Sequence, residues 1–282
     1  MLITIAIPTY NNEKTIAKAI QSALCQDYDD MYEILIVNNA SKDNTQNVIE
    51  SFNDEKIRVV VNMETYDMYT NHNICLKEAK GDYVLFCHSD DELLANALTV
   101  LSKRIIERGC PPRYIIWGHS VYRDYFKHLV RGNQSVNTMI SGEAALKCFL
   151  GSGLTPSGTC YSRQTLLDIG GFPISNNRSP EMDWAILIIA VFNLFEFEMV
   201  DRLLFKRMAA STAINISKKE WTKIHNDTFD ILFAKVSSSQ KEVFINEMLK
   251  YGPIYTLDAL KKYIPYIRYL KYFIIKKIQR QV

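Results

Sequence analysis

The sequence lacks every glycine-rich phosphate-binding motif. Neither GxGxxG nor GxxxxGK[ST] occurs in its 282 residues, and these motifs form the backbone cradle for phosphate in dinucleotide-binding and P-loop proteins. Their absence argues against a dehydrogenase and against a P-loop NTPase. A nucleotide bound by this chain would have to depend on a metal ion instead.

The chain also has no closely spaced cysteine pair and no long apolar run. Its six cysteines include no CxxC, and several lie within apolar stretches, which favours buried, reduced thiols and a reducing compartment. The most apolar stretch, Ala185–Phe192, is far shorter than the roughly 20 residues that a membrane span needs. The first residues show no signal-peptide pattern. We therefore expect a cytoplasmic protein without a membrane-spanning segment.

Composition is that of a folded protein with an uneven charge distribution. With 48% hydrophobic and 23% charged residues, the chain can bury the core of one large domain, or of a domain with a helical appendage. The net charge is +2, but Ala259–Val282 contains seven Lys or Arg and no acid, which leaves −5 on the remainder. A mildly acidic body therefore precedes a basic tail.

Strands and helices alternate through the first third of the chain. The expected strands are Leu2–Pro8, Glu33–Asn38, Ile57–Asn62 and Tyr83–Cys87, and the expected helices are Lys14–Gln26, Asp43–Phe52 and Asn71–Lys80. Alternation with continuously apolar strands predicts an α/β fold with a mostly parallel sheet and helices on both faces. Right-handed crossovers then bring the carboxyl ends of the strands to one edge.

Polar residues gather after the strands, most densely after Tyr83–Cys87, where His88, Ser89, Asp90 and Asp91 follow. Ligands of open α/β sheets bind at such strand ends, and paired carboxylates suit Mg²⁺ or Mn²⁺. An alternative is that the two aspartates only cap a helix starting near Leu93.

Five segments, in order and spacing, resemble the family 2 glycosyltransferases of GT-A fold, over roughly the first 210 residues. They read ITIAIPTYNNEKTIAKAIQSALCQDY, EILIVNNASKDNT, NHNICLKEAKGDYVLFCHSDDELL, LLDIGGF and EMDWAIL. The resemblance implies a Rossmann-like GT-A domain over residues 1–215, with a nucleotide-sugar-binding half (1–95) and an acceptor half (96–215). Residues 216–282 would form a helical C-terminal extension.

The resemblance implies that the first half of the domain binds a nucleotide-sugar donor together with a divalent metal, Mn²⁺ or Mg²⁺. The matching donor-binding positions are Pro8, Thr9, Tyr10, Glu13, Asn39, His72, Asn73, Ser89, Asp90 and Arg207. Asp90 and His88 match the metal position. Tyr10 and its neighbours would line the base and ribose pocket, and Asn39 would face the edge of a uracil or thymine.

Three departures from the family pattern affect this side. Asn38-Asn39 stands where the family usually has two aspartates, and an amide is a less selective partner for a pyrimidine. His72 replaces a frequent arginine, and His88 replaces the first aspartate of the DxD motif. Imidazole ligates Mn²⁺ more readily than Mg²⁺, which favours manganese. The alternative is that both are ordinary histidines of a polar pocket.

On the acceptor side the resemblance places the general base at Asp183, with Glu181 as an orienting group or as the base itself. Inverting transfer needs one carboxylate to take the proton of the acceptor hydroxyl. The local pattern also allows Asp183 to be only the N-cap of the following apolar helix. Met208 stands where many relatives carry a histidine that closes over the metal, so closure would depend on Lys206 or Arg207.

Beyond Ser217 the pattern is helical, with amphipathic segments at Trp221–Val236 and Gln240–Tyr251. The final segment, Tyr266–Val282, mixes aromatic and basic residues as interfacial helices do, although a helix packed on the body fits almost as well. We therefore expect a peripheral protein on the inner face of the cell membrane, bound to anionic lipid and to no nucleic acid.

The predicted function is that of an inverting hexosyltransferase. It would move a sugar from a UDP- or dTDP-sugar to a hydroxyl of a glycan acceptor, itself linked to lipid, in bacterial surface polysaccharide or lipopolysaccharide biosynthesis. Two alternatives remain open. One is a non-catalytic nucleotide-sugar binder. The other is a nucleotidyltransferase of related fold, against which the absence of a glycine- and lysine-rich N-terminal loop counts.

Overall fold

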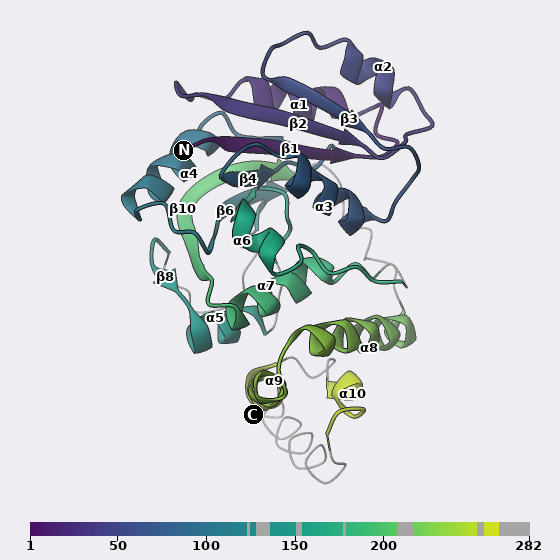
Figure 1. Ribbon diagram of the computed structural model, residues 1–282, viewed down its shortest axis with the longest axis vertical. Coiled ribbons are helices and arrows are strands. Elements are labelled where there is room, and N and C mark those ends of the chain that lie inside the picture. The colour runs from purple at the N-terminus through teal and green to yellow at the C-terminus, as the bar shows by residue number, and fades with distance from the viewer. Residues whose placement is uncertain are drawn as a thin grey trace.

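The computed structural model describes residues 1–122, 125–127, 136–150, 154–176, 179–207, 217–252 and 257–264. These residues form a ten-stranded sheet with helices on both faces (Figure 1). The strands are β1 (Ile3–Thr9), β2 (Tyr32–Asn38), β3 (Ile57–Val61), β4 (Tyr83–Phe86), β5 (Asp91–Leu93), β6 (Tyr114–Tyr122), β7 (Tyr125–Lys127), β8 (Met139–Ile140), β9 (Thr159–Ser162) and β10 (Glu196–Arg207). The helices are α1 (Ile16–Leu24), α2 (Thr45–Glu50), α3 (Met68–Glu78), α4 (Ala97–Glu107), α5 (Gly142–Phe149), α6 (Arg163–Asp168), α7 (Met182–Phe192), α8 (Lys218–Lys235), α9 (Ser238–Tyr251) and α10 (Leu257–Leu260).

The sheet confirms the predicted α/β class. Its order is β3-β2-β1-β4-β9-β6-β10-β5, with β7 beside β6 and β8 beside β10. Strands β3, β2, β1 and β4 are parallel, as predicted for the first third of the chain. Beyond them the sheet is mixed, because β9 is antiparallel to both of its neighbours and β5 is antiparallel to β10. The carboxyl ends of β1, β2 and β4 therefore meet at one edge.

Two apolar layers cover the sheet because successive residues of each strand point to opposite faces. On one face Ile5, Ile7 and Ile36 pack with buried residues of α1 and α4. On the other face Ala6 and Phe86 belong to a larger cluster with α3, α5, α7 and the C-terminal helices. Burial on both sides explains why these strands are apolar throughout.

The predicted helix near Leu93 is wrong. Asp91–Leu93 is a strand, in which Asp91 is paired with Arg207 and Leu93 with Phe205, and α4 begins only at Ala97. The local apolar spacing is compatible with a helix, but pairing with a strand distant in the sequence decides the conformation. Asp90 and Asp91 therefore do not cap a helix.

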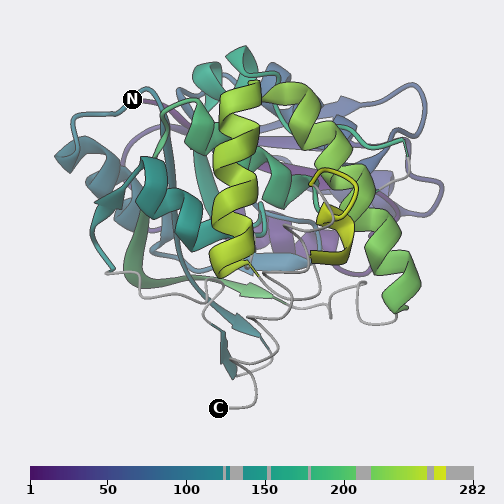
Figure 2. The same ribbon diagram turned by 90° about the horizontal axis from the view of Figure 1, so that it is seen from below.

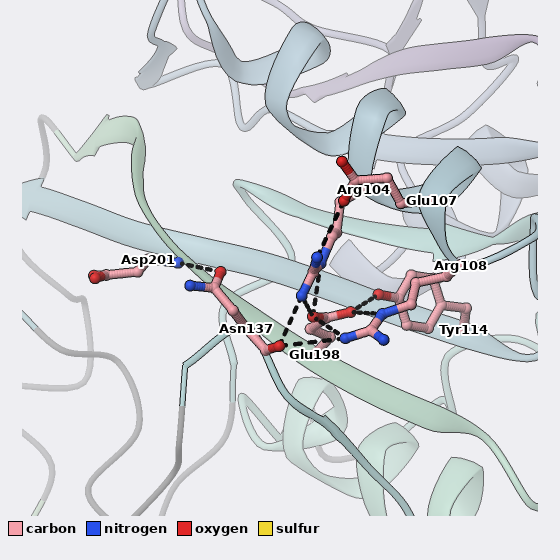
Figure 3. Close-up of polar contacts among 7 residues, drawn as sticks. All are labelled: Arg104, Glu107, Arg108, Tyr114, Asn137, Glu198 and Asp201. Atoms are coloured by element: carbon pink, nitrogen blue, oxygen red, sulfur yellow. Dashed lines mark hydrogen bonds and ion pairs between the residues drawn. The ribbon is translucent and has the colours of Figure 1, made fainter.

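A buried carboxylate joins α4 to β6 and β10 (Figure 3). Glu198 of β10 is fully buried and accepts hydrogen bonds from Arg104 at 2.5 Å, from Arg108 at 2.9 Å and from the Tyr114 hydroxyl. Burial alone would raise the pKa of Glu198, but the bonds from Arg108, Tyr114 and Arg104 outweigh it and hold this pKa below its ordinary value.

The C-terminal helices pack on the body next to α7 (Figures 1 and 2). Helix α7 is apolar on nearly all sides and is covered by α5 and α8. Helix α8 begins with a capping box in which Ser217 and Glu220 satisfy each other's backbone N–H groups. The two amphipathic helices predicted beyond Ser217 are confirmed as α8 and α9.

The predicted interfacial segment Tyr266–Val282 lies outside the described residues. Within the part of the chain that the structure describes, no helix has the length and apolar character needed to cross a bilayer.

Candidate functional site

Loops from three strands meet at the carboxyl edge of the sheet. The loop after β1 is bound to the loop after β4 by Asn12, whose Nδ2 donates to Ser89 Oγ at 2.7 Å, and to α2 by its own N–H, which donates to Thr45 Oγ1 at 2.8 Å. Asn11 and Ala40 in the loops after β1 and β2 have positive φ angles of 52° and 54°. Such backbone strain in non-glycine residues is common at functional sites.

Three potential metal ligands follow β4. A ring nitrogen of His88 and one carboxylate oxygen each from Asp90 and Asp91 lie within 4.8 Å of one another. Asp91 is buried, whereas His88 and Asp90 are partly exposed, so the cluster opens toward solvent on one side. The sequence pattern indicated the carboxylate pair Asp90 and Asp91 as suited to a metal, whereas the resemblance assigned only His88 and Asp90 as ligands.

His72 and His88, the imidazole pair, are in direct contact. Nε2 of His72 lies 3.0 Å from Nε2 of His88, and Nδ1 of His72 lies 2.7 Å from the carbonyl oxygen of Met68. Burial lowers the pKa of His72 to about 3 and that of His88 to about 4, so both rings are neutral at neutral pH. Two of the three departures from the family pattern are therefore neighbours in space.

Arg207, at the end of β10, stands next to both the metal cluster and the predicted base. Its positive charge contributes to lowering the pKa of His88 and opposes the rise in the pKa of Asp183. Its buried Nε has no hydrogen-bond partner among the described residues. A buried guanidinium N–H without a partner among the described residues favours the binding of an anion such as a diphosphate.

Asp183 lies in the first turn of α7, and the N-cap is Glu181, so the reading of Asp183 as N-cap is wrong. Asp183 Oδ1 accepts the Trp184 N–H at 2.7 Å. Burial, with a smaller contribution from the charge of Glu181, raises the pKa of Asp183 to about 7. A carboxylate with this pKa is suited to general-base catalysis at neutral pH.

Glu181 is held by the C-terminal extension. Its Oε2 accepts hydrogen bonds from His225 Nδ1 at 2.9 Å and from Thr228 Oγ1 at 3.0 Å, both on α8. Sequence reasoning missed both partners, because nothing in an isolated histidine on an amphipathic helix predicts a contact more than forty residues away.

The residues predicted for the base and ribose pocket lie at the end of β1. Pro8 and Thr9 are buried, and Tyr10 is 40% exposed. The Thr9 hydroxyl is buried without a hydrogen-bond partner among the described residues, which leaves a polar group available at the predicted pocket.

Asn39 is already engaged by protein groups. Its Oδ1 accepts from Asn62 Nδ2 and from the Tyr66 N–H, and its Nδ2 donates to the Tyr66 carbonyl at 2.9 Å. The amide oxygen is therefore occupied, and one N–H hydrogen remains for a ligand. The predicted contact of Asn39 with a base stays a prediction.

Glu13 and Asn73 make structural bonds in this conformation. Glu13 Oε2 accepts the Asn44 N–H at 2.9 Å. The side-chain amide of Asn73 donates to the carbonyl of Phe172 and accepts its N–H, both at 2.8 Å. Gly171 has φ +66°, and a Cβ there would approach Asn73 Oδ1 to 2.3 Å, so this turn requires glycine. Donor binding by Glu13 and Asn73 stays a prediction.

Comparison with known proteins identifies the family. The model of Glycosyl transferase family 2 matches residues 4–154, which is more than half of the chain. The chain belongs to glycosyltransferase family 2. The match includes the loop after β1, the imidazole pair and the metal cluster, so the predicted family is confirmed.

Two curated relatives illustrate the range of this glycosyltransferase family. The chain is 30% identical to the uncharacterized protein MT1568 of Mycobacterium tuberculosis over 184 residues, 61% of this chain and 56% of that protein. It is 36% identical to the E. coli enzyme WfgD, a UDP-Glc:α-D-GlcNAc-diphosphoundecaprenol β-1,3-glucosyltransferase, over 97 residues, 34% of this chain and 38% of WfgD. The chain thus spans about half or less of the length of these relatives.

Staphylococcus aureus TarS, crystallised with UDP-GlcNAc, has the same fold. It superposes with a TM-score of 0.66 and 17% sequence identity, over 96% of this chain and 79% of that structure. This likeness confirms the predicted GT-A fold of the family 2 chain.

Proposed function

We propose that this protein is an inverting glycosyltransferase that moves a sugar from a UDP- or dTDP-sugar to a hydroxyl group of a lipid-linked glycan in bacterial surface polysaccharide synthesis. The observation that carries the proposal is the position of Arg207, whose charge acts on both Asp183 and His88. A base of suitable pKa and a cluster suited to a divalent cation thus flank one guanidinium, which can itself bind a diphosphate.

The chemistry follows from this arrangement. Ionised Asp183 accepts the proton of the acceptor hydroxyl as that oxygen attacks the anomeric carbon, and the bond between this carbon and the diphosphate oxygen breaks on the opposite face. Arg207 donates to the departing diphosphate and offsets its charge. Glu181, held by His225 and Thr228, orients the acceptor side.

The residues of the metal cluster fit a divalent cation. Asp90 and Asp91 supply the oxygen atoms that Mg²⁺ and Mn²⁺ prefer, and His88 adds a nitrogen that favours Mn²⁺. When bound, the ion would neutralise charge on the diphosphate. Two hydroxyl groups can serve the rest of the donor: Ser89, whose Oγ accepts from Asn12, and Thr9, which has no hydrogen-bond partner among the described residues.

The donor and acceptor classes are drawn from the relatives. WfgD is named for a UDP-glucose donor and a diphosphoundecaprenol-linked acceptor, and TarS was crystallised with UDP-GlcNAc. For this chain both classes are proposals. We further propose that the basic segment Tyr266–Val282 binds an anionic membrane surface on the cytoplasmic side, where such an acceptor would lie.

The test is donor binding followed by turnover. Thermal unfolding with Mn²⁺ and a panel of UDP-, dTDP- and GDP-sugars should give stabilisation by the cognate donor, and that donor should then release its nucleotide when acceptor is added. Asp90→Ala should abolish the Mn²⁺-dependent stabilisation, whereas Asp29→Ala, which removes an exposed acid before β2, should leave it unchanged. Binding without turnover of any donor would favour the non-catalytic alternative.

A further inference from the structure

The imidazole pair forms a hydrogen-bonded chain whose proton positions can be deduced. The carbonyl oxygen of Met68 can only accept, so Nδ1 of His72 carries a hydrogen. His72 is buried among aromatic rings, and neither of its hydrogen-bond partners is an acid, so its surroundings do not favour an imidazolium and its Nε2 is a lone pair. Nε2 of His88 lies 3.0 Å away and must carry the hydrogen of this contact, since two lone pairs would repel. The nitrogen of His88 that remains to ligate a cation is therefore Nδ1.

The surroundings of His72 fix its ring plane. His72 is 2% exposed, stacks on Phe86 with ring centroids 5.1 Å apart, and meets the edge of Phe172 at 5.5 Å. The two imidazoles are nearly perpendicular, at 88°, so the lone pair of His72 meets the edge of the His88 ring. Aromatic packing thus determines which nitrogen of His88 is occupied and which remains for a ligand.

We infer that His72 is a positioning residue for the metal site: it binds the Nε2 hydrogen of His88 and so directs the unprotonated Nδ1 of His88 toward a cation shared with Asp90 and Asp91. Histidine ligands of metals generally donate their other N–H to a hydrogen-bond acceptor, usually a carboxylate, a carbonyl or water, and loss of that acceptor costs about 10- to 100-fold in metal affinity. Here the acceptor is the imidazole of His72. This inference rests on the proposed function, because it assumes that the cluster binds a cation.

The first test reads the tautomers directly in the wild-type protein. Two-bond ¹⁵N–¹H correlation spectra without metal at pH 7, assigned with the His88→Asp variant, should show His72 protonated at Nδ1 and His88 at Nε2. A His88 ring protonated at Nδ1 would overturn the inference. This measurement requires no variant of His72 to fold.

The second test measures metal binding without activity. Mn²⁺ affinity, followed by the EPR signal of free Mn²⁺, should fall about 10- to 100-fold in His72→Phe, which keeps the ring packing and removes the acceptor. Mg²⁺ affinity, measured by competition, should fall less, because Mg²⁺ depends less on nitrogen; general damage to the site would lower both equally. His119→Phe, which removes a comparably buried imidazole bound to Asp201, should leave both affinities unchanged.

The outcomes separate the two proposals. Pulsed EPR of the Mn²⁺ complex should show coupling to an imidazole nitrogen in the wild type and none in His88→Asp. Wild-type protein that binds no Mn²⁺ would refute the metal site and this inference together. Binding that is equal in wild type and folded His72→Phe would refute the role of His72 and leave the proposed function intact.

Discussion

Nδ1 of His225 on α8 lies 2.9 Å from Oε2 of Glu181 at the N-terminus of α7. Glu181 also accepts from Thr228 on the same helix, so its Oε2 is already engaged by two protein groups. Asp183 accepts only a backbone N–H of its own turn among the hydrogen bonds of the described residues. The contact between α8 and α7 therefore favours Asp183, and not Glu181, as the general base.

Replacing the base should affect turnover and spare binding. Asp183→Asn keeps an oxygen for the Trp184 N–H and removes the basic group, so we expect a loss of about 10²- to 10⁴-fold in transfer rate with unchanged donor affinity. Glu181→Gln is the matched control and should cost less. Steady-state kinetics and donor titration measure the two effects. A larger loss in Glu181→Gln would move the base to Glu181.

The rate should depend on pH through Asp183. Because burial raises the pKa of Asp183 to about 7, the carboxyl group is protonated and inactive below this pH and becomes ionised above it. We expect kcat/KM to rise as pH increases through about 7 and then to level off. A profile measured at constant ionic strength and saturating metal tests this, and an ascending limb near pH 4 would contradict it.

Glu198 should contribute to stability and to its pH dependence. Glu198→Gln leaves Arg104 and Arg108 without their shared acid, and we expect a loss of about 2–3 kcal/mol in the free energy of unfolding, below the range for fully buried pairs because both arginines are 23–29% exposed. Glu107→Gln removes the exposed acid that also contacts Arg104 and should cost less than about 1 kcal/mol. Urea denaturation measures both.

The stabilisation by Glu198 should decrease in acid. The pKa of Glu198 is lower in the folded than in the unfolded protein, so its contribution is complete above the ordinary glutamate pKa of 4.5 and is lost as pH falls through the lowered value. The stability difference between wild type and Glu198→Gln should therefore shrink in acid. A difference that stays constant from pH 7 to pH 3 would contradict this assignment.

The basic tail should draw the protein to anionic lipid. Tyr266–Val282 contains five basic residues and no acid. Each basic residue gives about 1 kcal/mol near a negatively charged surface, and the aromatic residues among them prefer the headgroup region. Removing Tyr266–Val282 should abolish sedimentation with anionic vesicles at low salt and spare hydrolysis of free donor. Neutral vesicles are the control. If the full-length protein does not sediment with anionic vesicles, membrane binding by this segment is refuted.

Sequence patterns were sufficient for the part of the fold that is locally determined. Strands β1, β2 and β4 were predictable because each is an apolar run buried on both faces, and the donor-side motifs follow them directly. The edge strand β3 is only partly buried, and its run of β-branched residues made it predictable. Strand β5 was not predictable, because the strand it pairs with, β10, lies in the second half of the sequence. The contacts of His72 with His88 and of Glu181 with His225 depend on packing between separate elements. The spacing of apolar residues along the sequence does not predict such packing.

The order of the sheet has a consequence for how the chain folds during synthesis. Strand β4 lies beside β9, and β5 lies beside β10, so the first half of the sequence cannot complete its hydrogen bonding until the second half has emerged from the ribosome. The pairing of Asp91 with Arg207 cannot form until more than a hundred further residues have been translated. Pairing over such separations slows folding and leaves strand edges exposed to other chains. Co-expressed fragments divided at residue 95 should therefore aggregate before they can reassemble.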